Sequence, residues 1–308
     1  MTVSIGLGLM EFPFAGAAGF WRWVDLCEQG GVDSLWQTDR IVSRAPILES
    51  MTTMAALAGR TRRIKFGMNV VSLAFRDPVL LAKQCATIDV LSEGRLLPAF
   101  GIGSPLSPEW QALGIDTKTR AARTDEGLDI IRRLWREERV THTGRFHRLA
   151  DVSILPRPVQ PDLPIWIGGS SEAAIRRTAR IGTGWIAGAE PAAEAGRVAA
   201  AIRTAASEAG RSIDDDHFGA GFPFHFGTAA DIAPAMEAYR TRTSRDPSTY
   251  FAVGDAQSIL AHLRTYVDAG ISKFILRPIG SETDILAQTR RLIDDLLPLA
   301  AAAWPKRA

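Results

Sequence analysis

Residues 69–103 read NVVSLAFRDPVLLAKQCATIDVLSEGRLLPAFGIG, and this stretch predicts a strand, a helix and a second strand in succession. Asp77 stands where a helix N-cap is expected, and Pro78 follows at the first helical position, where a missing N–H costs nothing. Apolar residues at steps of four and three then form one stripe: Leu81, Cys85, Ile88 and Leu91. The next strand, 96–102, is nearly all apolar, as is typical of a parallel strand covered on both faces. The stretch is therefore predicted to be a βαβ unit.

The same alternation of strand and helix continues along the chain. The other strands are predicted at 3–9, 34–36, 65–71, 164–167, 184–187, 218–226 and 273–276. Repeated βα units without a break in composition predict an α/β fold, a single (β/α)8 TIM barrel over residues 1–308. Insertions are expected after strand four (104–123), before strand five (136–162) and after strand seven (227–251), and Thr124 is expected to cap the helix that follows the first. The alternative is an open doubly wound sheet, but the turn after Leu9 lacks the glycine fingerprint that such a sheet carries.

Composition narrows the class of protein. The net charge of +2 comes from 36 basic and 34 acidic residues scattered along 308, which gives no footprint for nucleic acid or an acidic membrane surface. No apolar run approaches the roughly 20 residues of a membrane span, and no signal peptide is recognised, so a cytoplasmic location is expected. Cys27 and Cys85 both occupy apolar helix positions, which favours two buried thiols over a disulfide.

The segment from Ile165 to Ser171 reads IWIGGSS and is the strongest candidate for a ligand site. A strand that runs into two glycines and then into serines at a helix start gathers free backbone N–H groups, hydroxyls and the positive helix end at one point. This arrangement predicts a phosphate seat, because phosphate sites recur after the late strands of such barrels. The alternative is a tight turn with a serine cap.

Other polar residues are expected near the carboxyl ends of the strands, where barrel active sites lie. Asp39 and Arg40 follow strand two and Arg277 follows strand eight, and for these an ion pair that holds a loop is the structural alternative. Asn69 is either a ligand contact or a turn residue. His225 is the one histidine expected to face the site. The histidines show no metal-ligand spacing, so no metal is predicted, and no serine elbow supports covalent hydrolysis.

Taken together, the chain resembles the bacterial luciferase-like family of flavin- or deazaflavin-dependent oxidoreductases. The resemblance covers nearly the whole length, and several blocks in the right order make it specific. The blocks are DSLW with Asp39 at 33–39, TRRIKFG at 61–67, ATIDVLSEGR at 86–95, GIG at 101–103, PIWIGGSS at 164–171 and GTGW at 182–185.

This resemblance implies a barrel that holds FMN or F420, with the cofactor ring at the strand mouths. It implies that Gly168, Gly169, Ser170 and Ser171 hold the phosphate, and that Asn69, Val70 and Ser104 line the ring, with a non-prolyl cis peptide at Asn69–Val70. The catalytic candidates are Asp39, Arg40, His225 and Arg277, and Arg44 is a substrate candidate.

The chain departs from the F420-dependent sugar-phosphate dehydrogenases of that family. Those enzymes carry histidine where Arg40 stands and tryptophan where Arg44 stands, and their glutamate after strand four is replaced by an apolar residue near Leu106. An FMN-linked monooxygenase that uses O2 and a small organic substrate is therefore favoured, with a separate flavin reductase as partner. The alternatives are an F420-dependent hydride-transfer enzyme and a non-catalytic flavin-binding subunit. Family likeness also suggests a homodimer through helices of the first half, including one that begins at Pro46.

Overall fold

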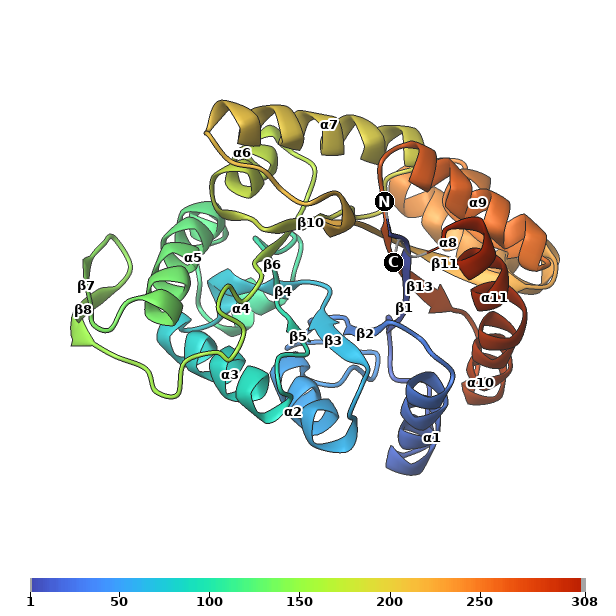
Figure 1. The fold of residues 1–308 in the computed structure, drawn as a ribbon, viewed down its shortest axis with the longest axis horizontal. Helices are drawn as coiled ribbons and strands as arrows, with labels where there is room; N and C mark the ends of the chain where they lie inside the picture. Colours follow the sequence, from blue (N-terminus) through green and yellow to red (C-terminus); the bar gives the residue numbers. More distant parts are fainter. Residues whose placement is uncertain (1, 306–308) are drawn as a thin grey trace.

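The computed structural model describes residues 2–305, and its centre is a curled parallel sheet that helices surround (Figure 1). The strands of the main sheet are β1 (Ser4–Leu9), β2 (Ser34–Gln37), β3 (Lys65–Met68), β4 (Val71–Ser72), β5 (Leu96–Leu97), β6 (Ala99–Gly101), β9 (Trp166–Gly168), β10 (Gly184–Ile186), β11 (Phe218–Phe226), β12 (Ala252–Gly254) and β13 (Lys273–Pro278). The helices are α1 (Ala17–Gln29), α2 (Ser50–Arg60), α3 (Pro78–Leu91), α4 (Glu109–Ala112), α5 (Arg120–Arg136), α6 (Glu172–Ile181), α7 (Ala192–Glu208), α8 (Ala233–Thr243), α9 (Ala256–Asp268), α10 (Glu282–Arg291) and α11 (Leu297–Ala303). The predicted α/β fold with a parallel sheet inside and helices outside is confirmed.

Two predicted strands are each divided in two by a local feature. The strand expected at 65–71 becomes β3 and β4, separated at Asn69–Val70, and the one expected at 96–102 becomes β5 and β6, separated at Pro98. Pro98 has no N–H to give to a ladder. The two divided strands remain neighbours, because β3 pairs with β5 and β4 pairs with β6, but the register shifts by one residue between the halves: Gly67 lies opposite Leu97 and Val71 opposite Phe100. From β6 the pairing continues through β9, β10, β11, β13 and β1 to β2 and β3.

Two predicted helix starts are wrong. Helix α5 begins at Arg120, so Thr124 lies inside the helix, where its hydroxyl donates to the Arg120 carbonyl oxygen at 2.8 Å instead of capping. Helix α2 begins at Ser50, because the Glu49 side chain accepts from the Thr52 N–H at 2.7 Å and serves as the cap, so no helix starts at Pro46.

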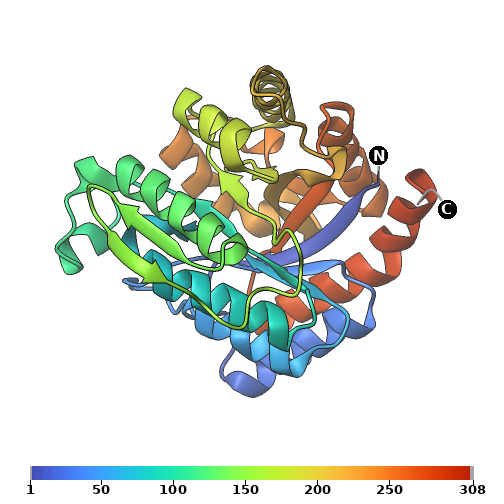
Figure 2. The same ribbon diagram turned by 60° about the vertical axis from the view of Figure 1, so that its left-hand side comes forward.

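The excursion at 136–162 contains a hairpin that the sequence did not indicate. Strands β7 (Val140–Thr143) and β8 (Arg148–Val152) pair antiparallel and stand out to one side of the ring of helices (Figures 1 and 2). The Glu126 carboxylate on α5 accepts from the N–H groups of Phe146 and His147 at 3.1 and 2.8 Å, which fixes the hairpin turn. The segment after β8, residues 153–162, is held by Asp89. This side chain is fully buried and accepts from the Val159 N–H at 2.9 Å.

The long insertion after β11 is also ordered. It contains α8, and it ends in β12, which pairs parallel with the last residues of β11. This short strand was not expected from the sequence, since it follows 25 residues of loop and helix. The insertion therefore returns to the sheet and widens the wall at its carboxyl end.

The core has an inner part enclosed by the sheet and an outer part between sheet and helices. The inner part is small and consists of Trp36, Ala99, Trp166, Ile186 and Ile275. Both cysteines lie in the outer part of the core as free, buried thiols, as predicted. Burial raises the pKa of each thiol. Among residues 2–305, no helix combines the length and apolar character that crossing a bilayer requires.

The amino ends of the strands are closed by paired charges. Lys273, at the start of β13, is almost fully buried and donates to the Asp33 carboxylate, which precedes β2. Arg95, just before β5, donates to the carbonyl oxygens of Ala58, Thr61 and Ile64. These contacts join the strand starts to each other and to α2.

Candidate active site

A cavity of about 960 Å³ opens at the carboxyl ends of the strands. Residues from both halves of the chain line the cavity, including Leu9 at the end of β1, Asp39 after β2, Gly101 in β6, Gly168 in β9 and Arg277 in β13. Its size is in the upper part of the range of ligand pockets, about 300–1,000 Å³. The strand ends that the sequence singled out therefore meet around one space large enough for a tricyclic ring.

The segment between β3 and β4 forms part of the cavity wall. The peptide bond between Asn69 and Val70 is cis, as the family resemblance implied, and both residues line the cavity. The Val70 side chain is packed against two neighbouring strands at glycine positions: an added Cβ at Gly101 or Gly168 would lie 2.7 or 3.1 Å from Val70 Cγ2. Glycine is required at these two places because Val70 fills the space.

Asp39 lies at the cavity but its carboxylate is fully engaged. Oδ1 accepts from the Ser50 hydroxyl at 2.6 Å and from Arg76 Nη2 at 2.5 Å, and Oδ2 accepts from the Ser72 N–H at 3.0 Å. The Asp39 side chain is 2% exposed. Through these contacts Asp39 ties β4 to the loop after β2. Such a role corresponds to the structural alternative given above, in which an ion pair holds a loop.

Arg40 reaches across the cavity rim to the first insertion. Its Nη1 donates to the Ser107 hydroxyl at 2.8 Å and lies 3.9 Å from Glu109 Oε2. Glu109 is a buried carboxylate that the sequence did not single out, and it also accepts from the Ile41 N–H at 3.2 Å. Burial acts to raise the pKa of Glu109, but hydrogen bonds from Ser107 and the main chain outweigh it, so the pKa is lowered. Leu106, near which the resemblance implied that an apolar residue replaces a family glutamate, is 91% exposed.

The loop from β9 to α6 has the form expected of a phosphate seat. The main-chain N–H groups of Gly169, Ser170 and Ser171 have no hydrogen-bond partner within residues 2–305. The Ser171 hydroxyl caps α6 by accepting from the Ala174 N–H at 3.3 Å, so that serine is a cap, while Gly168 and Gly169 line the cavity. The Ser170 hydroxyl donates to Glu190, which the sequence analysis missed, although Glu190 follows β10 at the same end of the sheet.

Arg277 and the insertion after β11 form the opposite wall. Arg277 Nη1 donates to the Tyr250 hydroxyl oxygen at 3.1 Å. The Tyr250 ring stacks on Tyr239 of α8, with ring centroids 4.8 Å apart, and both tyrosines line the cavity. Arg242 of α8 lines it as well. The third insertion thus contributes directly to the site, and its aromatic residues were not among the expected contacts.

Two of the predicted catalytic and substrate residues do not line the cavity. Ser104 lines the cavity as expected, but His225 and Arg44 are not among the lining residues. His225 Nε2 lies 3.5 Å from Asp231 Oδ2, and its Nδ1 is buried without a partner in the described chain. Arg44 is exposed. The roles of all these residues stay predictions.

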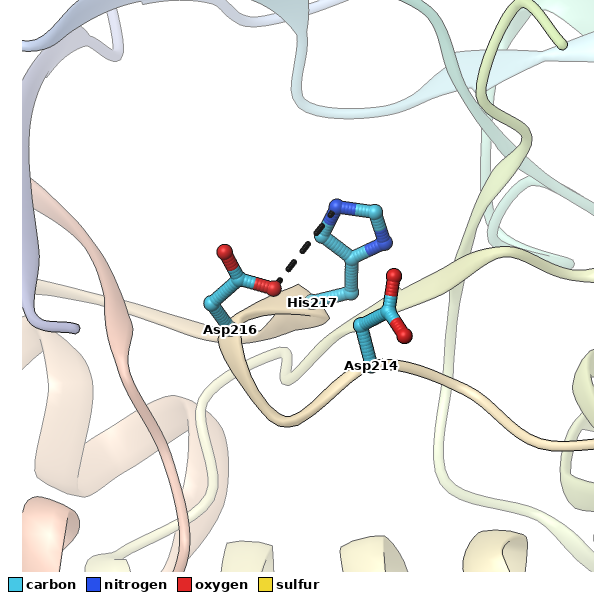
Figure 3. Close-up of side chains that lie close together, drawn as sticks. All are labelled: Asp214, Asp216 and His217. Atoms are coloured by element: carbon cyan, nitrogen blue, oxygen red, sulfur yellow. Dashed lines mark ion pairs between the residues drawn. The ribbon is translucent and has the colours of Figure 1, made fainter. Parts of the chain in front are cut away.

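One group of possible metal ligands lies at the far end of the sheet, before β11. The ligand atoms of Asp214, Asp216 and His217 lie within 4.8 Å of one another (Figure 3). His217 Nδ1 is 2.8 Å from the Thr183 carbonyl oxygen, and both aspartates are exposed. Solvated acidic groups of this kind are common without an ion, so the absence of a metal stays the prediction.

Comparisons with known proteins place the site in context. The profile of a family described as luciferase-like monooxygenase matches residues 12–294. An F420-dependent glucose-6-phosphate dehydrogenase of Microbacterium testaceum is 33% identical over 204 residues, which cover 62% of this chain and 59% of that protein. The chain spans a little over half the length of the relatives at this identity, 57% and 59% in two cases.

Solved structures share the fold over nearly the whole chain. The monooxygenase RslO1 from Streptomyces bottropensis superposes with a TM-score of 0.83 at 24% identity, covering 96% of this chain and 99% of that one. An F420-dependent secondary alcohol dehydrogenase, in complex with an F420–acetone adduct, gives a TM-score of 0.81 at 18% identity, covering 97% and 99%. At these identities the likeness concerns the fold.

Proposed function

The chain belongs to the luciferase-like monooxygenase family, and from that premise we propose that it is an oxidoreductase that binds FMN or F420 in the cavity and acts on a small organic substrate. The observation that carries the proposal is the cavity of about 960 Å³ at the strand ends, with the Asn69–Val70 segment and the Gly168–Gly169 turn in its wall. We also propose that the curled sheet is a (β/α)8 barrel forming one domain over residues 1–308, a reading supported by the circuit of strand pairings.

The residues of the cavity fit a flat ring with an anionic tail. Val70, held between Gly101 and Gly168, offers an apolar face for the ring. The free N–H groups of Gly169 and Ser170 and the amino end of α6 would take the phosphate. When bound, either cofactor supplies the transfer of electrons or hydride, since the cofactor carries the hard chemistry.

The chain's own residues would bind, orient and exclude water. Asp39 holds the start of β4, and with it the Asn69–Val70 wall, in place. Arg40 and Arg277 project positive charge toward the substrate side. Tyr239 and Tyr250, in the insertion after β11, cover one side of the cavity and would keep solvent from the ring.

The reaction has two candidate forms. In the first, favoured by the sequence, reduced FMN from a separate reductase and O2 oxygenate the substrate. In the second, F420 exchanges a hydride with the substrate, and this form is supported by the relative of Microbacterium testaceum, 33% identical, that is named an F420-dependent glucose-6-phosphate dehydrogenase. A homodimer and a cytoplasmic location are proposed with either form. A non-catalytic flavin-binding subunit would bind a cofactor and turn over nothing.

The test is a side-by-side titration of the purified protein with FMN and with F420, followed by cofactor fluorescence. Saturable binding of at least one is expected, and a protein that takes up neither at millimolar concentration would end the proposal. Transfer of an oxygen atom from isotopically labelled O2 into an organic substrate in the presence of reduced FMN would then identify the first form, because free reduced FMN consumes O2 by itself. Substrate-dependent bleaching of F420 absorbance would identify the second form.

A matched pair of variants tests the substrate side. Arg40 lines the cavity, whereas Arg44, four residues later in the same loop, is exposed and does not. Arg40→Ala should lower kcat/KM by about tenfold or more, as expected on losing a charged contact to the reacting groups. Arg44→Ala should change it less than about twofold. If Arg40→Ala lowers kcat/KM no more than Arg44→Ala does, Arg40 has no special role in the site.

A further inference from the structure

The loop that would hold the cofactor phosphate is hydrogen-bonded to a carboxyl group from the neighbouring strand end. Ser170, in the turn between β9 and α6, donates its hydroxyl to Glu190 Oε1. Glu190 lies in the segment after β10, whose Gly188 and Ala189 line the cavity. The Tyr266 hydroxyl donates to the Glu190 carbonyl oxygen at 2.9 Å, which fixes the main chain at this residue. The carboxyl group is thus a built part of the wall beside the phosphate seat.

The second oxygen of this carboxyl group is unsatisfied. Glu190 Oε2 is buried and has no hydrogen-bond partner within residues 2–305. An added Cβ at Gly188 would lie 3.2 Å from Oε2, so the oxygen sits directly behind a cavity-lining glycine. A buried acceptor without a partner costs free energy, and such groups persist at functional sites.

Cations do not neutralise this corner of the cavity. The arginines that line the cavity are Arg40, Arg242 and Arg277, on the loop after β2, on α8 and on β13. The nearest arginine by contact is Arg245, which donates to the Ala189 carbonyl oxygen at 2.9 Å but is paired with Glu194. The seat therefore offers N–H donors and a helix end to an anion, together with one negative side chain.

We propose that Glu190 makes this seat select a phosphodiester over a phosphate monoester, and hence F420 over FMN. The inference rests on the proposed function and deepens it. A monoester has a second pKa near 6 and carries close to two negative charges at neutral pH, whereas a diester carries one. Repulsion by a carboxylate a few ångströms away grows with that charge, and in a partly buried site it is weakly screened. This preference reverses the sequence-based choice of FMN.

The experiment measures binding, not turnover. FMN, riboflavin and F420 are titrated by fluorescence at pH 7.5 against the wild-type protein, Glu190→Gln and the control Glu194→Gln, which changes a carboxylate paired with Arg245 and outside the cavity lining. Glutamine keeps an acceptor for Ser170. We expect the wild type to bind F420 more tightly than FMN. Glu190→Gln should tighten FMN by about tenfold and leave riboflavin and F420 within about threefold, and Glu194→Gln should change none of the three.

A second measurement uses the wild-type protein alone. Lowering the pH from 7.5 to 5.5 protonates the FMN phosphate, so FMN affinity relative to riboflavin should rise by about tenfold, following the monoester pKa near 6. FMN binding at least as tight as F420 in the wild type, or a flat FMN-to-riboflavin ratio across this pH range, would overturn the selectivity alone. A wild-type protein that binds none of the three ligands would overturn the proposed function with it.

Discussion

At the amino ends of the strands Lys273 is joined to Asp33 and Arg95 donates to three carbonyl oxygens, whereas at the carboxyl ends Arg242 and Arg277 line a cavity with no ion-pair partner among residues 2–305. The same strands carry both ends. At the amino ends these contacts stabilise the sheet, whereas the carboxyl ends carry both a buried pair, Asp39 with Arg76, and unsatisfied polar atoms such as Glu190 Oε2. The contrast teaches that stability and ligand binding are separated along the strand direction, as is expected of this kind of α/β fold.

The largest challenge to this contrast is the removal of Asp33. Asp33→Ala leaves the Lys273 ammonium almost fully buried without its partner, and should lower the free energy of unfolding by about 3–5 kcal/mol. Burial acts to raise the pKa of Asp33, but Lys273 outweighs it, so the pKa is lowered and this stability should fade in acid. Urea titration measures the loss. The double variant Asp33→Leu with Lys273→Met should recover most of it, and a double variant no better than the single one would contradict the buried-pair reading.

His262 is an exception, since it is an unpartnered polar group away from the mouth. It lies on α9 against Phe222, and burial lowers the pKa of its imidazole to about 4. Because the unfolded chain takes up a proton near pH 6.5 and the folded chain does not until about pH 4, stability should fall by about 3 kcal/mol as the pH drops between these values. Denaturation of His262→Leu across this range should show a shallower slope; an unchanged slope would assign the acid loss to other groups.

Asp39 is the one mouth residue expected to matter for stability. Asp39→Asn keeps the shape but turns an acceptor toward the donors of Ser72 and Arg76 into a donor, and should cost about 1–3 kcal/mol. It should also weaken cofactor binding, because β4 follows the Asn69–Val70 wall. Asp77→Asn is the control. Because asparagine caps helices as well as aspartate does, this change at the start of α3 should alter the free energy of unfolding by less than about 0.5 kcal/mol. Full stability with lost turnover would instead make Asp39 catalytic.

The smallest effect is expected at Arg242. It is exposed on α8 and has no ion pair within the described part of the chain, so Arg242→Gln should change the free energy of unfolding by less than about 0.5 kcal/mol. A loss above about 1 kcal/mol in urea titration would show that an arginine of the mouth without an ion-pair partner also stabilises the fold.

The sequence predicted those features that depend on local pattern. The cap at Asp77 follows from neighbouring residues and is found, and three of the four predicted stripe residues of α3 are buried, while Leu91 at the helix end is 62% exposed. The turn predicted after Ile167 begins one residue later, because β9 continues through Gly168. The cis bond at Asn69–Val70 came from family resemblance, because no local rule singles out a non-prolyl site.

What the sequence missed depends on contacts between distant segments. Glu109 accepts a hydrogen bond from the Ile41 N–H, and Glu190 accepts one from the Ser170 hydroxyl. Neither contact can be predicted before the strands are placed side by side. The hairpin β7–β8 was missed because its turn is fixed by Glu126, which lies 14 residues before the start of β7. Thr124 looked like a cap because capping residues also occur inside helices, where they donate to the preceding turn.

The two cysteines have a practical consequence. Both are buried and their thiolate forms are disfavoured, so reagents that modify thiols should leave the native chain untouched. A single cysteine introduced at Leu106, which is 91% exposed on the first insertion, would then be the one labelled position. A dye attached there would report whether that insertion moves when a ligand enters, without any background from the rest of the molecule.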